Sequence, residues 1–211
     1  MTKSLMLWSL SVLLAGSVAF AQEMPRFTGK VGAGFTTPTD TAGDRLDRGW
    51  NLGAGAGVNF SPHFTLMGDF QYNHFGVNAG TLNALGFPDG DASLWSLTLD
   101  PVIHTHPRGP VDVYFTGGGG LYHWHQQFTQ PTTETVTAFD PYFGFFYQAA
   151  VPVNQVLSSY SMNKFGWNGG GGVEFGTPWS AKIFAEVRYH RMLLGNDRHA
   201  DFVPITFGVR W

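Results

Sequence analysis

The 211-residue sequence contains no cysteine, little charge and no excess of basic residues. The lack of cysteine excludes disulfides, thiolate metal sites and cysteine nucleophiles. Only 13% of the residues are charged, and 15 Asp and Glu outnumber 12 Lys and Arg, which leaves no basic footprint for gripping a phosphate backbone. We therefore expect no nucleic-acid partner. With 28 Gly and 16% aromatic residues, the composition is instead typical of strands and turns within one domain.

The N-terminal segment, residues 1–21, has the features of a secretory signal peptide. Lys3 is its one charge, an apolar run follows over residues 5–15, and small residues close the segment at Ala21. The apolar run is shorter than the roughly 20 residues that a membrane-spanning helix needs, which argues against the alternative of a permanent anchor. We expect cleavage after Ala21, which leaves residues 22–211 as one exported domain.

The rest of the chain alternates apolar and polar residues with the period of two that is typical of strands. Every second residue from Trp50 to Phe60 is apolar, and the same holds from Val203 to Trp211. The alternation predicts eight strands, at residues 30–37, 50–60, 64–74, 94–104, 111–124, 163–176, 181–190 and 203–211.

The connections between these strands alternate in length. Short turns are expected at residues 61–63, 106–110 and 177–179, and longer loops at residues 38–49, 76–92, 128–161 and 192–201. Tight turns at one end and long loops at the other are typical of an up-and-down barrel in an outer membrane.

The composition of the two strand faces distinguishes a membrane barrel from a soluble one. A soluble barrel would set several Lys or Glu opposite its apolar residues, whereas here the polar face is mostly Gly, Asn, Thr and Ser. The apolar face is long enough to cross hydrocarbon at a tilt. We therefore expect an all-β fold, an eight-stranded antiparallel up-and-down transmembrane β-barrel.

The tryptophans provide a second indication of a membrane barrel. Trp50, Trp95, Trp124 and Trp167 are expected near the long loops, and Trp179 and Trp211 near the short turns. These positions predict two aromatic girdles at the membrane surfaces. The alternative is that they are core aromatics of a soluble sandwich.

With these features the chain resembles the small eight-stranded outer-membrane β-barrels, the OmpA-barrel and OmpX-like group. The resemblance covers residues 30–211 and is most specific in the final strand, where alternating apolar residues lead to the terminal aromatic Trp211. The family more often ends in Phe. The resemblance implies a Gram-negative-type cell envelope, an outer membrane in which lipid and lipopolysaccharide surround the barrel, and an assembly machinery that recognises the final strand at Trp211.

Eight strands close on a lumen that side chains fill, so we expect no wide pore. The inward face carries Gly on some strands and large residues on others, and inward charges need partners because an unpaired buried charge is costly. The predicted network pairs Asp69, Asp100, Glu174 and Glu186 with Lys164, Lys182, Arg188 and Arg210.

Two GGGG runs, residues 117–120 and 169–172, are expected to meet side by side. They relieve crowding where the wall bends. An outward docking strip for a second barrel is the alternative.

Two histidine pairs, His104/His106 and His123/His125, each place two imidazoles on one strand face. The topology puts the two pairs at opposite membrane surfaces, and neither has an obvious third ligand. We expect interfacial polar residues and no metal or cofactor site.

Residues 188–192 faintly resemble the motif of lipid A deacylases, in which a serine stands two residues after the histidine. Met192 takes that place after His190, so the nucleophile is missing, and Ser158, Ser159 and Ser161 belong to another loop. We assign no catalytic residues and expect no enzyme.

The loop at residues 128–161 is the strongest candidate for function, because residues 139–147 form an aromatic cluster that is unusual in a solvated loop. One interpretation is a self-packed cap over the barrel mouth that extends the strands above the membrane. The other is a binding surface for an extracellular partner, a host molecule or a hydrophobic solute. We predict an integral outer-membrane barrel with a structural or loop-mediated binding or adhesion role. The alternatives are an OmpW-like small-solute conduit, which the polar inward residues argue against, and a lipid A-modifying enzyme.

Overall fold

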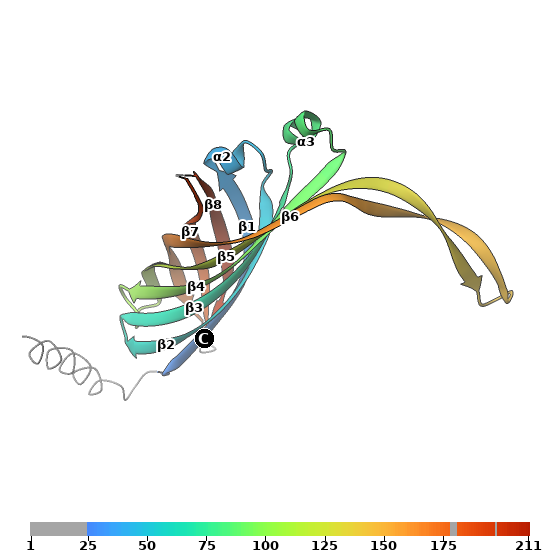
Figure 1. The fold of residues 1–211 in the computed structure, drawn as a ribbon. Coiled ribbons are helices and arrows are strands. Elements are labelled where there is room, and N and C mark those ends of the chain that lie inside the picture. Colours follow the sequence, from blue (N-terminus) through green and yellow to red (C-terminus); the bar gives the residue numbers. More distant parts are fainter. Residues whose placement is uncertain (1–24, 178–180, 197) are drawn as a thin grey trace, which may run out of the picture.

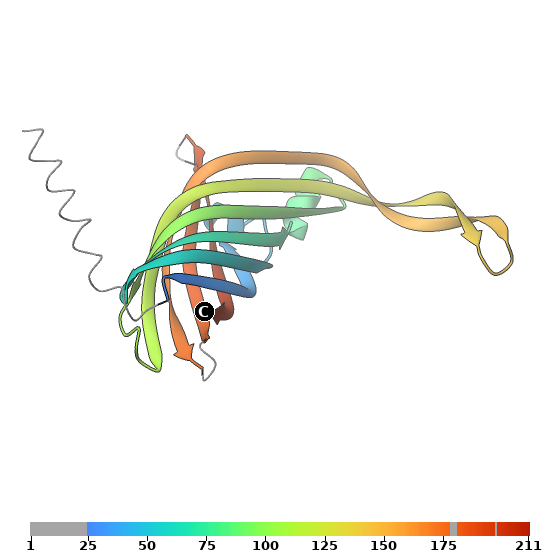
Figure 2. The same cartoon turned by 90° about the horizontal axis from the view of Figure 1, so that it is seen from below.

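The computed structural model describes residues 25–177, 181–196 and 198–211, which form a closed barrel of eight antiparallel strands (Figures 1 and 2). Each strand pairs with its sequence neighbours, and the last strand returns to pair with the first. The strands are β1 (Phe27–Thr39), β2 (Gly49–Ser61), β3 (Phe64–Gly76), β4 (Asp89–His104), β5 (Val111–Asp140), β6 (Phe145–Gly176), β7 (Lys182–Gly195) and β8 (Arg198–Arg210). The predicted up-and-down barrel is confirmed, while the predicted signal peptide, residues 1–21, lies outside the described residues.

The two faces of each strand meet different surroundings, as strand β4 illustrates. Leu97 and Leu99 point outward and are 53% and 57% exposed, whereas the alternate residues Ser96, Thr98 and Asp100 are buried in the lumen. A water-soluble protein shows the reverse arrangement. The predicted orientation, with apolar side chains outside and polar ones inside, is therefore confirmed.

The two ends of the barrel are built differently. At one end, which we call the turn end, β2 and β3 are joined by residues 62–63 and β4 and β5 by residues 105–110. At the other, the loop end, the connections contain helix α2 (Asp40–Gly43) and helix α3 (Ala79–Leu85). No helix in the described part of the chain is long and apolar enough to span a membrane.

The long loop predicted at residues 192–201 is wrong, because β7 continues to Gly195 and β8 begins at Arg198. Gly195 and Asn196 have φ values of 90° and 52°. Glycine and asparagine tolerate this left-handed backbone, which a tight hairpin needs. The Gly-Asn pair was therefore a turn signal within the sequence.

The prediction of a loop at residues 128–161 is also wrong, because β5 and β6 pair through most of it, up to Asp140↔Phe145. The pairing of β5 with β4 ends at Asp89↔Thr129, and that of β6 with β7 ends at Gly166↔Met192. Residues 129–156 therefore form a two-stranded ribbon, which we call the arm. The arm extends away from the loop end rather than over it (Figures 1 and 2), so the predicted cap is wrong and the predicted extension of the strands is confirmed.

The tryptophans follow the predicted girdles with one exception. Trp50, Trp95 and Trp167 are exposed on the outer wall towards the loop end, and Trp211 is exposed at the turn end. Trp124 is instead buried inside the barrel, so its assignment to a girdle is wrong. Trp179 lies outside the described residues.

Large side chains from some strands fill the space next to glycines on others. A Cβ atom at Gly172 would lie 2.5 Å from the Tyr114 hydroxyl oxygen, and one at Gly208 would lie 2.8 Å from the Phe184 ring. The two GGGG runs meet at a single pair, Gly117↔Gly169, and are offset elsewhere.

We expect Gly172→Val to destabilise the barrel by about 1–3 kcal/mol, because the new side chain overlaps Tyr114 in a filled lumen. Gly169→Val is the matched control, because its Cβ would meet open space on the outer wall. Urea unfolding in detergent micelles measures both variants. Equal midpoints for the two would contradict the packing described here.

Candidate functional sites

The first candidate site is a cluster of buried charges in the lumen around Arg188 of β7. Its guanidinium donates hydrogen bonds to Asp69 Oδ2 and to Asp100 Oδ2, each at 2.7 Å, and its Nε lies 2.8 Å from Glu186 Oε1. All four side chains are buried. The predicted pairing of these three carboxylates with Arg188 is confirmed.

Sequence reasoning missed one member of this cluster and misplaced another. Lys30 Nζ lies 2.5 Å from Asp69 Oδ2 and 3.2 Å from Glu186 Oε1. The sequence did indicate that Lys30 points into the lumen, because Lys30 lies on the same face of its strand as glycines that were expected to point inward. Lys164, which was predicted to join the network, belongs to none of the ion pairs between described residues.

Neutral donors complete this cluster. Asn168 donates to Asp100 Oδ1 at 2.9 Å, Thr98 donates to Asp100 Oδ2 at 2.8 Å, and the Tyr114 hydroxyl donates to Glu186 Oε2 at 2.8 Å. Three carboxylates therefore share two cations and these added hydrogen bonds. These charged side chains come from β1, β3, β4 and β7 and meet inside the barrel.

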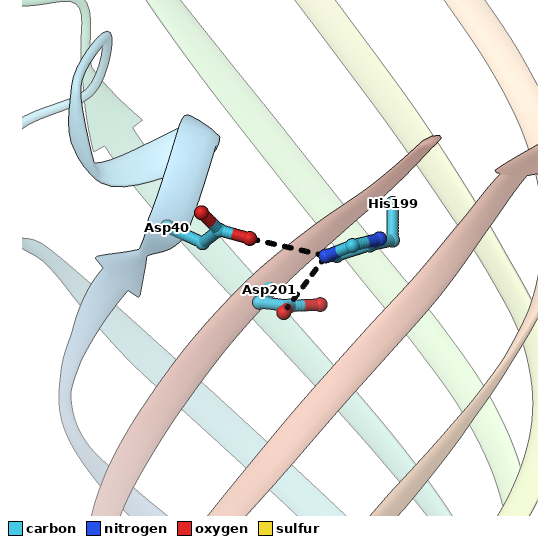
Figure 3. Close-up of side chains that lie close together, drawn as sticks. All are labelled: Asp40, His199 and Asp201. Atoms are coloured by element: carbon cyan, nitrogen blue, oxygen red, sulfur yellow. Dashed lines mark hydrogen bonds and ion pairs between the residues drawn. The ribbon is translucent and has the colours of Figure 1, made fainter. Parts of the chain in front are cut away.

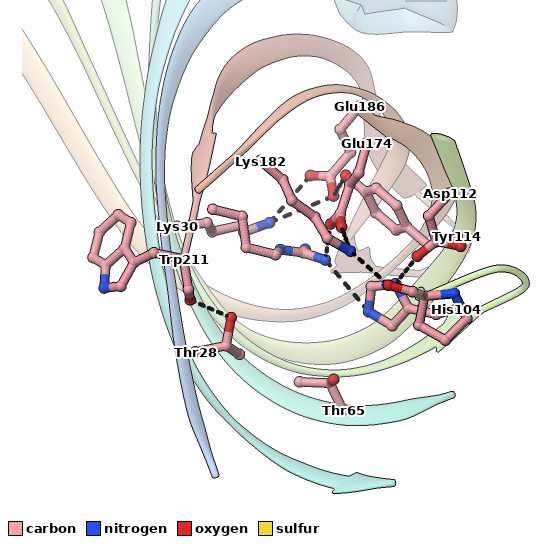
Figure 4. Close-up of polar contacts among 12 residues, drawn as sticks. Thr28, Lys30, Thr65, His104, Asp112, Tyr114, Glu174, Lys182, Glu186 and Trp211 are labelled. Carbon is pink, nitrogen blue, oxygen red and sulfur yellow. Dashed lines mark hydrogen bonds and ion pairs between the residues drawn. The ribbon is translucent and has the colours of Figure 1, made fainter. Parts of the chain in front are cut away.

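A second charged cluster lies nearer the turn end (Figure 4). Glu174 forms ion pairs with Arg210 and with Lys182, the latter at 3.1 Å. Beside it, His104 Nδ1 lies 2.6 Å from Asp112 Oδ2. The predicted pairing of Glu174 with Lys182 and Arg210 is confirmed.

The structure corrects the prediction for His104, which is buried in the lumen rather than interfacial. It also has the neighbours that sequence reasoning did not find, because ligand atoms of His104, Asp112 and Glu174 lie within 4.8 Å of one another. Such a set has the composition of a metal site. Both cations of the cluster already compensate Glu174, so the geometry is explained by ion pairing.

A third cluster joins α2 to β8 at the loop end (Figure 3). His199 Nε2 lies 3.1 Å from Asp40 Oδ2 and 3.5 Å from Asp201 Oδ2. Asp201 also accepts hydrogen bonds from Arg191, at 3.0 Å from Nε and 2.7 Å from Nη2. These contacts connect α2 to the rim of the barrel. Arg191 already pairs with Asp201, the carboxylate that a metal at this position would need as a ligand.

The other three histidines of the two predicted pairs, His106, His123 and His125, make local hydrogen bonds. His106 lies at the turn end, while His123 and His125 lie on β5 towards the loop end, as predicted. Their Nδ1 atoms contact Asn163 Oδ1 at 2.6 Å and Ser161 Oγ at 2.8 Å on the neighbouring strand.

The segment around His190 does not provide a catalytic arrangement in the described structure. His190 is buried, with Nδ1 3.0 Å from the Tyr122 hydroxyl, and Met192 is packed in an apolar cluster. Of Ser158, Ser159 and Ser161, which the sequence analysis placed in another loop, Ser161 contacts His125 on the neighbouring strand.

The lumen changes character towards the loop end, which the sequence analysis did not anticipate. There the inward side chains form an apolar cluster: Leu46, Phe75, Val77, Ala92, Leu94, Tyr122, Trp124, Met192 and Phe202. On the loop-end side of this cluster lies a pocket of about 350 Å³. It is formed by α2, α3 and the loop-end parts of β5 to β8. Trp124, Leu46 and Met192 contribute to its lining, and Arg45 and His199 bring charge or polarity to it. Its size and apolar lining are within the range of small-molecule sites.

The tip of the arm, residues 139–147, is the most exposed apolar feature. Tyr142 is 95%, Phe143 80% and Phe146 71% exposed, and Phe139, Phe145 and Tyr147 are also exposed. Gly144, with φ 68°, closes the turn, and the Asp140 side chain accepts hydrogen bonds from the backbone N–H groups of Tyr142 and Phe143. The sequence analysis found this cluster but not the ribbon that carries it.

A closed ring of eight strands with apolar residues outside and paired charges inside defines a small transmembrane β-barrel. The family model described as "Outer membrane protein beta-barrel domain" matches residues 7–211, and the chain belongs to this family. It is an outer-membrane β-barrel protein.

Solved structures agree with this fold. The chain is similar to Neisserial surface protein A, with 14% identity and a TM-score of 0.56, over 88% of this chain and 96% of that one. It is also similar to Ail, the attachment invasion locus protein of Yersinia pestis, with 20% identity and a TM-score of 0.51, over 89% of this chain and 100% of that one. No curated protein sequence matches the chain. The structural likeness concerns the fold alone.

We expect Arg188→Met to destabilise the barrel by about 3–5 kcal/mol, because three carboxylates would be left with Lys30 as their one cation. Arg48→Met is the control, since Arg48 is exposed and belongs to none of the ion pairs between described residues. Urea midpoints in detergent at neutral pH measure the difference. A loss for Arg188→Met no larger than for Arg48→Met would contradict the central role of the lumen cluster.

Proposed function

We propose that the protein is a non-enzymatic binding protein of the cell surface, in which the barrel anchors the arm and the tip contacts an extracellular partner. The observation that carries the proposal is the exposure of six aromatic side chains at the tip. Exposed apolar clusters on folded proteins are typical of interaction sites. A ribbon that holds these side chains far from the barrel adds little to the stability of the fold. It does bring them within reach of another molecule or surface.

The direction of the arm supports this role. Outer-membrane barrels keep short turns on the periplasmic side and longer segments outside. The loop end, with α2, α3 and the arm, therefore faces the exterior. At about 3.3 Å per residue, the 12 residues from Thr129 to Asp140 carry the tip roughly 40 Å beyond the end of β4.

The names of the two similar structures are compatible with the proposal. One protein is called a surface protein and the other an attachment invasion locus protein. At 14% and 20% identity these names add no evidence about ligand or partner.

The same proposal includes a route to the membrane. The precursor would be exported and cleaved after Ala21, and the assembly machinery would recognise β8 with its terminal Trp211. Trp211 is exposed, and its backbone exchanges two hydrogen bonds of 3.0 Å with Gly29, so the end of the chain lies at the closing seam of the barrel. Lipid and lipopolysaccharide would surround the outer wall, and the protein would need no metal or cofactor.

Removing most of the arm tests the proposal. Glu134 and Val151 are paired, so residues 135–150 can be replaced by an Asn-Gly turn that joins the two strands. We expect a barrel that still shifts on gels when heated, while attachment of a producing strain to cultured cells falls to that of a strain without the protein. Replacing residues 79–85 of α3 by a Gly-Ser segment of equal length should leave attachment unchanged. Attachment that survives loss of the arm would refute the proposal.

A second candidate function rests on the apolar pocket at the loop end. It resembles the alternative of a small-solute conduit, since a pocket of about 350 Å³ suits a small apolar molecule. Passage through the barrel would have to cross the Arg188 cluster, whose side chains are bound to one another across the lumen. Binding without passage is therefore the form of this alternative that we favour.

Binding of the apolar dye N-phenyl-1-naphthylamine to the protein in nanodiscs tests this second candidate. Ala200→Phe, which fills the pocket, should weaken binding, whereas Leu193→Phe on the outer face of the same hairpin should not. Planar bilayers should show no porin-like conductance. Dye binding that is unchanged by Ala200→Phe would argue against binding in this pocket. A stable conductance would support the alternative of a small-solute conduit.

A further inference from the structure

Resting on the proposed function, we propose that the partner of the tip is a lipid bilayer: the aromatic side chains of residues 139–147 insert into the interfacial layer of an apposed phospholipid membrane. Four features of the tip support a lipid surface over a protein groove.

The first feature is that the rings surround the tip. Phe139 and Phe146 are cross-strand partners whose ring centroids lie 5.0 Å apart. Phe145 lies one residue from Phe146 and therefore points to the other face of the ribbon, where its ring lies 6.3 Å from both Phe143 and Tyr147. A protein groove covers one face of a hairpin, whereas a bilayer surrounds an inserted hairpin on every side. An apolar surface on both faces matches the second case.

The second feature is the depth of the aromatic segment. About three residues separate the Phe139–Phe146 pair from the turn at Tyr142 and Phe143, which amounts to roughly 10 Å at strand spacing. Interfacial segments bury their apolar face about 5–10 Å into the boundary between headgroups and acyl chains. The polar Thr137 and Gln148, which pair with each other behind the rings, would then lie at the membrane surface.

The third feature is charge. Residues 129–163 contain no Lys, Arg or His, and their acidic residues are Glu134 and Asp140. The segment therefore has no cation for an acidic lipid or a sulfated polysaccharide. Phe and Tyr without basic residues suit a zwitterionic surface, where rings partition into the interface without electrostatic help.

The fourth feature is preorganisation. The Asp140 carboxylate accepts hydrogen bonds from Tyr142 N at 2.8 Å and Phe143 N at 3.2 Å, and Gly144 N donates to Asp140 O at 2.8 Å. These bonds hold the turn closed with the rings outward. They also satisfy backbone groups that would otherwise enter a poorly solvated layer unpaired.

Flotation of the mature full-length protein in nanodiscs with phosphatidylcholine vesicles tests the proposal. We expect the wild-type protein to float with the vesicles at 0.1 M and at 1 M NaCl alike. The triple variant Tyr142→Ser, Phe143→Ser and Phe146→Ser should lower the partition coefficient by about a hundredfold or more. The matched control removes three exposed apolar residues away from the tip, in the part of the hairpin that we call the shaft (residues 129–138 and 148–157): Val136→Ser, Val156→Ser and Leu157→Ser.

A fluorescent reporter locates the contact. The arm contains no tryptophan, so Phe143→Trp adds a single emitter at the tip and Thr133→Trp one on the shaft. After subtraction of the wild-type spectrum, brominated phosphatidylcholine in the target vesicles should quench the tip reporter and not the shaft reporter. Heat-shifted gel mobility verifies that every variant is a folded barrel.

The outcomes separate this inference from the proposed function. Flotation that survives the triple substitution, or that the shaft control loses equally, overturns insertion by the tip. Absence of flotation together with tip-dependent attachment to cells that protease treatment of the cells abolishes identifies a protein partner, and refutes the lipid inference while the proposed function stands. Absence of both flotation and tip-dependent attachment refutes both.

Discussion

Hydrocarbon around the outer wall is the constraint on which the rest of the structure depends. Backbone N–H and C=O groups at membrane depth have no water to bond, so the sheet must close on itself. The seam between β1 and β8 achieves this, with register from Lys30↔Arg210 to Thr39↔Asp201 and a final pair of bonds between Gly29 and Trp211. Closing eight strands leaves a lumen so narrow that each large inward side chain needs a small neighbour, and each inward charge an opposite one.

The layers of the lumen reinforce one another. The apolar cluster around Phe75 and Trp124 lies between the loop end and the polar and charged layers below it. By excluding water from that side it lowers the local dielectric, which strengthens the attraction between Arg188 and its carboxylates and raises the cost of breaking it. The turn end is more open, with a cavity of about 290 Å³ lined in part by Lys182, Glu174 and Arg210. Water that enters at the turn end therefore meets charged side chains, and solutes at the loop end meet an apolar surface.

The sequence predicts the barrel well because hydrocarbon imposes a strict two-residue period on every crossing strand. The same parity would have placed Trp124 correctly, since it stands three residues after the lipid-facing Leu121 and so points inward. It would also have placed His104 inward, but the partners Asp112 and Glu174 come from strands whose register no local pattern reveals, so the buried cluster was not predicted. The bounds of β5 and β6 within the arm escaped prediction because water surrounds both faces of the ribbon, so alternation is not enforced there. The sequence does contain a turn signal within the arm, because Asp, Pro and Gly at residues 140, 141 and 144 favour a turn.

The arm has open strand edges, which the barrel avoids because its sheet is closed. Beyond Thr129 on β5 and Gly166 on β6, each strand has one edge without a strand partner, and such edges invite pairing between copies. Few charges are available to prevent it. Instead Pro131 of β5 pairs with Asn154, and Pro152 of β6 pairs with Thr133, two residue pairs further along the arm. Proline has no N–H to donate and is tolerated at sheet edges, so each strand of the arm is a poor template for a further strand. Because backbone pairing is discouraged along the shaft, side chains have to supply any contact that the arm makes, and its largest exposed side chains are concentrated at the tip.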